Sequence, residues 1–272
     1  MSFARLLSDG AFPVALEITP PQRSLPHVLL RRAGLIGPAA SAINVIQRPE
    51  RQSSLEASLE LLAAGLDPAW HLVTRGRPAA EIQSELAIAR DAGVAQVLVI
   101  AGDHASPDRG LTIREVVGLA SRTMPGSLVG ATLNQYVPDG AAVLRNLMPK
   151  IAAGAGYVQT QPVFDFERLR PFAEAVKGRA PETKIVAMAM PLLTAEAAAR
   201  IGARLGIDPP AVPTAQPEAW AAFERVLAAL AQSPLIDGVA LMTFETDPRP
   251  ETGAGILAAL RGAGIGPSFA RD

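Results

Sequence analysis

The chain has 272 residues, a formal net charge of −1 and no cysteine. The near-neutral charge argues against electrostatic binding of nucleic acid or acidic membranes, and the lack of cysteine excludes disulfides, thiolate metal ligands and a cysteine nucleophile. Met1 to Pro13 lacks the apolar core of a signal peptide, and no apolar run reaches the length of a membrane span, so we expect a cytoplasmic protein without a membrane partner.

Short runs of small and β-branched residues alternate with longer helical stretches along the chain. A short leading helix is predicted at 1–8. Strand and helix pairs then follow at 12–18 and 25–35, 42–46 and 53–64, 70–74 and 79–92, 97–101 and 112–123, 128–132 and 140–153, 157–160 and 166–177, 184–188 and 194–205, and 238–242 and 251–261. A proline-rich loop at 208–217 and a further helix at 218–231 lie between the seventh and eighth units.

Helix boundaries are marked by residues that favour helix ends. Ser53 and Thr112 stand where an N-cap is expected, and Gly65, Gly93 and Gly206 follow the last turns of their helices. The helices are therefore short and separated by defined turns.

Eight alternating strand–helix units predict a parallel sheet, and their number and length are typical of a single (β/α)8 TIM barrel spanning residues 1–272. The alternative is an open doubly wound sheet. That fold usually carries a G-x-G-x-x-G turn after the first strand when it binds a dinucleotide, and no such turn is present here.

In such a barrel, the carboxyl ends of all strands meet at one mouth, where barrel enzymes place their chemistry. Polar residues mark these ends in seven of the eight units: Glu17, Asn44, His71, Asp103, Thr132, Gln161 and Thr243. Residues far apart in sequence are therefore expected to line one cavity.

Glu17 lies between Leu16 and Ile18 near the end of the first strand. Removal from water raises the pKa of a carboxyl group, and a carboxyl that stays protonated near neutral pH can act as a general acid. The alternative is a glutamate bonded to a neighbouring strand or exposed at the rim. Asp103 follows the strand 97–101 and Gly102; it either contributes to the site or caps the next turn.

The three histidines do not have the spacing of metal ligands. His27 falls in a helix, His71 in a strand and His104 in a loop, so no metal site is expected. His71 by itself is compatible with a structural hydrogen bond.

Asn146 and Lys150 lie one helical turn apart and share a face. Lys150 could reach a phosphate or a cofactor, whereas the simpler interpretation is a solvated helix surface. The Arg75-Gly76-Arg77 turn is a further candidate for binding an anion.

Five motifs, in this order, resemble the methylenetetrahydrofolate reductase family over residues 16 to about 172. They are Leu16-Glu17-Ile18-Thr19-Pro20-Pro21, His71-Leu72-Val73-Thr74, Ile100-Ala101-Gly102-Asp103, Lys150-Ile151-Ala152-Ala153-Gly154-Ala155 and Thr160-Gln161-Pro162-Val163-Phe164-Asp165.

The resemblance implies a (β/α)8 barrel that holds FAD at the strand ends and passes hydride from NADH or NADPH, through the flavin, to methylenetetrahydrofolate. It implies Glu17 as the general acid that helps to open the five-membered ring of the folate, Asp103 as a residue that tunes the flavin, and Gln161 as a hydrogen-bonding partner of folate or nicotinamide. The residues that would contact FAD are His71, Gly102, Asp103, Thr132, Asn146 and Lys150.

Departures from the family pattern keep two alternatives open. Ala101 stands where familiar members have an arginine available to FAD, which suggests a flavin-independent reductase of the same folate. The last third of the chain matches the family only faintly, which suggests a folate-binding barrel without reductase activity in methyl-transfer metabolism. Under every alternative the expected partner is a small-molecule folate, and a homo-oligomer is compatible with the fold.

Overall fold

The computed structural model describes residues 1–102 and 110–266. Eight parallel strands form a closed barrel in the order β1 to β8, and β8 pairs with β1. The strands are β1 (Val14–Ile18), β2 (Ala42–Val45), β3 (Pro68–Val73), β4 (Gln96–Ile100), β5 (Leu128–Leu133), β6 (Tyr157–Pro162), β7 (Lys184–Ala189) and β8 (Gly238–Leu241). The predicted (β/α)8 barrel is confirmed.

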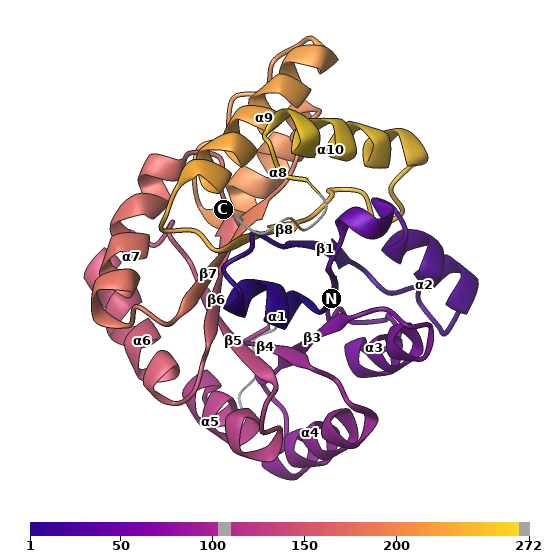
Figure 1. Cartoon of the computed structure of the whole chain (residues 1–272), viewed down its shortest axis with the longest axis vertical. Coiled ribbons are helices and arrows are strands. Elements are labelled where there is room, and N and C mark those ends of the chain that lie inside the picture. The colour runs from indigo at the N-terminus through magenta and orange to yellow at the C-terminus, as the bar shows by residue number, and fades with distance from the viewer. Residues whose placement is uncertain (103–109, 267–272) are drawn as a thin grey trace.

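The helices surround this barrel as an outer ring (Figure 1). The ring consists of α2 (Pro26–Ala33), α3 (Ser54–Ala63), α4 (Ala79–Ala92), α5 (Ile113–Thr123), α6 (Gly140–Ala152), α7 (Phe166–Arg179), α8 (Ala195–Leu205), α9 (Gln216–Gln232) and α10 (Pro250–Gly262), with a 3-10 turn at Gly37–Ala39. The first helix, α1 (Phe3–Ser8), is not part of the ring. No described helix is long and apolar enough to cross a membrane.

The helix ends follow the expected local chemistry. The Thr112 hydroxyl accepts a hydrogen bond from the Glu115 N–H, and the Glu115 carboxylate accepts one from the Thr112 N–H, forming a capping box. The Ser53 hydroxyl caps α3 by accepting a hydrogen bond from the Glu56 N–H, and Gly93 ends α4 with a φ of 85°, in the left-handed region that glycine adopts without strain.

Among the carboxyl ends of the strands, the largest difference from the prediction is found in β6. It was predicted to end at residue 160 and continues through Gln161 to Pro162. Its pairing with β7 shifts register between Gln159 and Pro162. The Thr160 hydroxyl accepts a hydrogen bond from the Met188 N–H at 2.9 Å, which satisfies a backbone donor at this irregularity. Gln161 is thus held within the strand.

The barrel interior is filled by side chains from alternate strand positions. Ala15, Leu98 and Tyr157 pack there with Phe3 and Leu7 of α1. Helix α1 lies across the centre of the ring and closes its amino-terminal end (Figure 1). A catalytic cavity therefore has only the opposite end available.

The side chains of β1 point alternately into the barrel and toward the surrounding helices. Leu16 and Ile18 belong to the large cluster between strands and helices, whereas Ala15 belongs to the interior cluster. Glu17 shares the inward face with Ala15, because successive side chains of a strand point to opposite sides.

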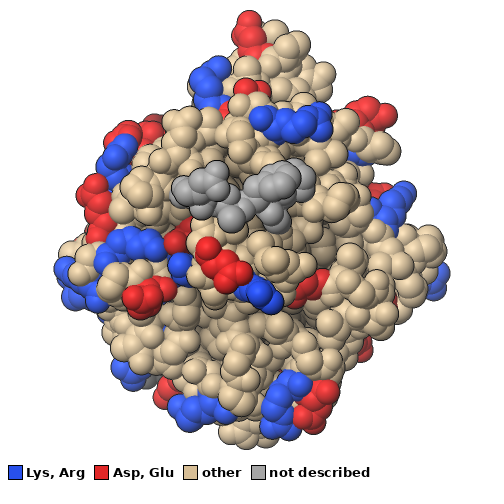
Figure 2. Space-filling view, in the orientation of Figure 1, with Lys and Arg blue, Asp and Glu red and all other residues tan. Residues whose placement is uncertain are grey.

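Figure 2 shows the end of the molecule that α1 covers. Acidic and basic side chains are interspersed around its periphery, and no extended patch of one charge dominates. This distribution agrees with the net charge of −1.

Candidate active site

The mouth of the barrel holds a cavity of about 260 Å³, here called the mouth cavity. Five of the residues predicted to form one site line it: Glu17, His71, Gly102, Thr132 and Gln161. They come from five different strand–helix units and meet because all parallel strands end on the same side. Asp103, the other residue predicted there as catalytic, lies outside the described residues.

Glu17 combines a desolvated carboxyl with access to the cavity. Burial raises its pKa from 4.5 to about 7, against the opposing effects of the Arg204 and Arg48 charges and a hydrogen bond from Gln159. Near neutral pH the carboxyl therefore exists in both protonation states. That is the property needed to donate a proton to a ligand in the cavity.

Asn44 and Gln159 form a polar pair beside Glu17. Asn44 Nδ2 donates a hydrogen bond to Gln159 Oε1 at 2.9 Å, and both residues are buried. Because the oxygen of the Gln159 amide accepts from Asn44, its NH2 group is left to donate to the Glu17 carboxylate.

Gln159 is a site residue that was not predicted from the sequence. The signal was present in the alternation Tyr157, Gln159 and Gln161 along one strand, since these residues share the inward face. Asn44 was predicted at the mouth; it pairs in register with Glu17 and bonds to Gln159, but it does not line the mouth cavity. Thr243 lines an adjoining small cavity that also includes Glu17.

His71 lines the mouth cavity from β3 and is almost fully buried. Burial lowers the pKa of its imidazole to about 3, so the ring is neutral at physiological pH. Among the described residues, its Nε2 atom has no hydrogen-bond partner. A buried polar atom without a partner is unfavourable, so His71 is suited to bond a polar group of a ligand.

Two arginines also line the mouth cavity, Arg48 after β2 and Arg204 at the end of α8. Neither was singled out from the sequence, because no local pattern distinguishes them from other surface arginines. Their positive charges act on Glu17 and partly offset the effect of burial on its pKa.

The two predicted cofactor residues of α6 are not brought to this cavity. Asn146 is exposed, and Lys150 is partly buried with a pKa lowered by desolvation. Neither lines the mouth cavity. Of the residues assigned to FAD, His71, Gly102 and Thr132 therefore line the mouth cavity, whereas Asn146 and Lys150 do not.

Potential metal ligands are also dispersed. Within residues 1–102 and 110–266, no group of three or more His, Asp or Glu side chains is placed to hold a metal ion.

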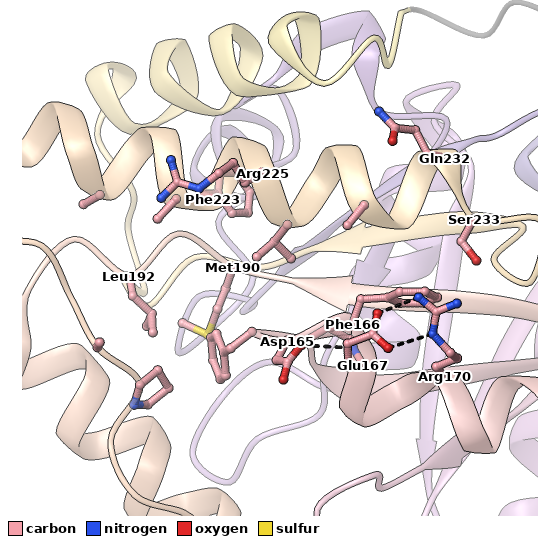
Figure 3. A pocket seen from close by; sticks show the side chains of 18 of the residues that line it. Asp165, Phe166, Glu167, Arg170, Met190, Leu192, Phe223, Arg225, Gln232 and Ser233 are labelled. Carbon is pink, nitrogen blue, oxygen red and sulfur yellow. Dashed lines mark hydrogen bonds and ion pairs between the residues drawn. The ribbon is translucent and has the colours of Figure 1, made fainter.

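A larger cavity of about 880 Å³ lies outside the barrel, between α7, α9 and the loops after β6 and β7 (Figure 3). Phe166, Met190 and Phe223 contribute apolar walls, and Glu167 pairs with Arg170 at one side. None of the residues predicted to be functional lines it. The mouth cavity is the better candidate site because titratable groups with shifted pKa values converge there.

Comparison with known proteins supports the family suggested by the motifs. The family model described as methylenetetrahydrofolate reductase matches residues 133–216, which include the Lys150 and Gln161 motifs but not Glu17 or His71. No curated protein sequence matches the chain significantly.

A solved structure with a similar fold is an uncharacterized protein from Clostridium thermocellum that binds two copies of 5-methyl-5,6,7,8-tetrahydrofolic acid. It is 12% identical, with a TM-score of 0.70, over 95% of this chain and 98% of that chain. The family model thus matches under half of the chain, and the solved structure shows that the two proteins share the barrel fold.

Proposed function

We propose that the protein is an oxidoreductase that binds a reduced folate at the barrel mouth and converts 5,10-methylenetetrahydrofolate to 5-methyltetrahydrofolate with hydride from NADH or NADPH. The observation that carries the proposal is Glu17, whose pKa is raised to about 7 where it lines the mouth cavity. The family match and the folate-binding neighbour supply the substrate class.

The proposed reaction uses Glu17 as the acid. In methylenetetrahydrofolate one carbon bridges N5 and N10. Protonation of N10 by Glu17 allows the bond between that carbon and N10 to break, with its electron pair going to N10. The carbon is left as an iminium on N5, and a hydride from NAD(P)H adds to it to give the N5-methyl group and NAD(P)⁺.

The other residues position the substrate and the acid. Gln159 donates to the ionised form of Glu17 and so stabilises the state that remains after proton transfer. The neutral imidazole of His71 and the Gln161 amide offer hydrogen bonds to the ring system, and Met188 and Met242 supply apolar walls. A site of this kind holds a flat heterocycle by apolar contact and orients it by a few polar groups.

We favour direct hydride transfer from the nicotinamide, because Asn146 and Lys150, two of the residues assigned to FAD, do not line the mouth cavity. A flavin would supply a hydride carrier between the nicotinamide and the folate. It remains the second candidate, and the lining of the mouth cavity by His71, Gly102 and Thr132 is what favours it.

The proposal is tested by assaying the purified protein for NAD(P)H oxidation that depends on methylenetetrahydrofolate, with an absorption spectrum recorded before any flavin is added. Turnover by protein without a flavin band supports direct transfer. Turnover only after FAD addition supports the flavin route. Folate binding without NAD(P)H oxidation would overturn the reductase and indicate a folate-binding barrel.

A further inference from the structure

A groove of about 560 Å³, here called the arginine groove, opens beside the mouth cavity. The two spaces share part of their lining: Gln47, Arg48, Val73, Ala101 and Gly102. Among the described residues that line the groove, Arg48, Arg51 and Arg75 are basic and Glu50 is acidic. A ligand that leaves the mouth cavity on this side therefore passes the side chains of Arg48 and Arg51.

The loop that carries Arg48 and Arg51 is fixed by hydrogen bonds. Gln47 Oε1 accepts from the Ser54 N–H at 2.8 Å, and its Nε2 donates to the Arg48 carbonyl at 3.3 Å. The Gln52 N–H donates to the Pro21 carbonyl at 2.9 Å and ties the loop to the segment after β1. The two arginines thus stand on a preorganised support, which reduces the entropy lost when they bind a ligand.

Within the described part of the chain, no close ion pair neutralises the charge of Arg48 or of Arg51. Across residues 1–102 and 110–266, neither guanidinium has a carboxylate within 4.0 Å. Arg77, in contrast, pairs with Glu81 at 2.6 Å and Glu85 at 2.7 Å. The anion-binding potential predicted for the Arg75–Arg77 turn is therefore not carried by Arg77.

The arginine groove is a more suitable space for the rest of a ligand than the space beside Thr243, on the other side of the mouth cavity. The mouth cavity, at about 260 Å³, is smaller than the ~300–1,000 Å³ of sites that enclose drug-sized ligands. The space on the Thr243 side measures only about 40 Å³, and it places two carboxyl groups, those of Glu17 and Glu245, beside Arg32 and Arg48.

We propose that the arginine groove binds a negatively charged arm, built of carboxylates or phosphates, of a ligand whose ring system lies in the mouth cavity. The inference rests on the proposed function for the identity of that ring. Two ligands of the proposed reaction carry such an arm, the glutamate tail of the folate and the diphosphate of the nicotinamide dinucleotide. Guanidinium groups bind both chemistries through paired hydrogen bonds.

The experiment measures binding by calorimetry to the wild type and to Arg51→Gln and Arg48→Gln variants. One pair of probes is 5-methyltetrahydrofolate with one and with three glutamates, and the other is NADPH and the reduced nicotinamide mononucleotide. Arg225→Gln serves as the matched control, because Arg225 is an exposed arginine on α9 outside the groove.

We expect Arg51→Gln to lower the affinity for one of the two longer probes, the triglutamate folate or NADPH, about tenfold, since one charged hydrogen bond corresponds to roughly that factor. The difference in affinity between that probe and its shorter partner should shrink accordingly. Loss with triglutamate assigns the groove to the folate tail, and loss with NADPH assigns it to the diphosphate. Unchanged affinities for all four probes in both variants would overturn the proposal.

A direct probe separates failure of this inference from failure of the proposed function. If the wild type binds neither folate nor nicotinamide, the proposed function fails. Tripolyphosphate is then titrated alone. Binding that weakens about tenfold in Arg51→Gln but not in Arg225→Gln still supports an anion site, and equal binding by all variants refutes it.

Discussion

The amide of Asn44 donates a 2.9 Å hydrogen bond to the amide oxygen of Gln159 across the barrel interior, although 115 residues separate the two in sequence. This bond leaves the Gln159 NH2 group to donate to Glu17. The Asn44–Gln159 pair therefore orients the acid at the barrel mouth. Gln159 lines the mouth cavity, whereas Asn44 does not.

Replacing Glu17 by Gln tests the proposed acid. The side chain keeps its size and its bond from Gln159, but it cannot protonate N10, so we expect kcat for folate reduction to fall by about 10²-fold or more. Folate affinity should change little. Steady-state kinetics and folate titration measure both quantities, and a variant with unchanged kcat would remove Glu17 from the mechanism.

Replacing Gln159 by Leu removes the hydrogen bond that favours the ionised form of Glu17, so the pKa of Glu17 should rise above about 7. The pH–rate profile should then extend to higher pH, an effect that loss of packing alone does not produce. The variant also leaves the buried Asn44 amide without its acceptor, which should lower the free energy of unfolding by about 1–3 kcal/mol.

The double variant Asn44→Leu, Gln159→Leu provides the control for that effect. It removes donor and acceptor together, so its loss of stability should be smaller than the sum of the two single losses. Denaturant unfolding of the wild type, both single variants and the double variant gives the coupling free energy. Simple additivity would show that the Asn44–Gln159 bond contributes nothing.

The stability of the wild type should decrease as pH rises from about 4.5 to about 7. In this window folded Glu17 holds a proton that the unfolded chain releases, so deprotonation favours unfolding. The Glu17→Gln variant lacks this group. Above pH 7 its free energy of unfolding should exceed that of the wild type by at most roughly 3 kcal/mol, and below pH 4.5 the difference should vanish. Urea unfolding at several pH values measures it; parallel curves for the two proteins would contradict the raised pKa.

A pair of glycine substitutions tests the packing of the barrel interior. In Gly130→Ala, the added methyl group would collide with the ring of Tyr157, which is itself buried, so we expect a loss of about 1–3 kcal/mol. Gly178 lies in α7, and no atom lies within 4 Å of the position that an added methyl group would take, so Gly178→Ala should stabilise by about 0.5–1 kcal/mol. Thermal unfolding of both variants checks the contrast, and equal effects would show that Tyr157 can move aside.

The barrel and the inward direction of its polar strand residues could be predicted from the amino-acid sequence. Runs such as Val97 to Ile100 are apolar on both faces, as a parallel strand under a helix must be, and their alternation with eight helical stretches leaves few other folds. Glu17 and Gln161 were predicted at the mouth because both lie near the carboxyl ends of parallel strands, and those ends converge in a closed barrel.

The side chains that meet inside the barrel, and the helix residues that reach it, could be identified only in the folded molecule. The Asn44–Gln159 bond depends on how the strands are staggered when the barrel closes, and that stagger is set by packing across the whole interior. Asn146 and Lys150 do share α6, but neither of them lines the mouth cavity. Local residue patterns fix the period of an element, whereas contacts between distant elements fix its orientation.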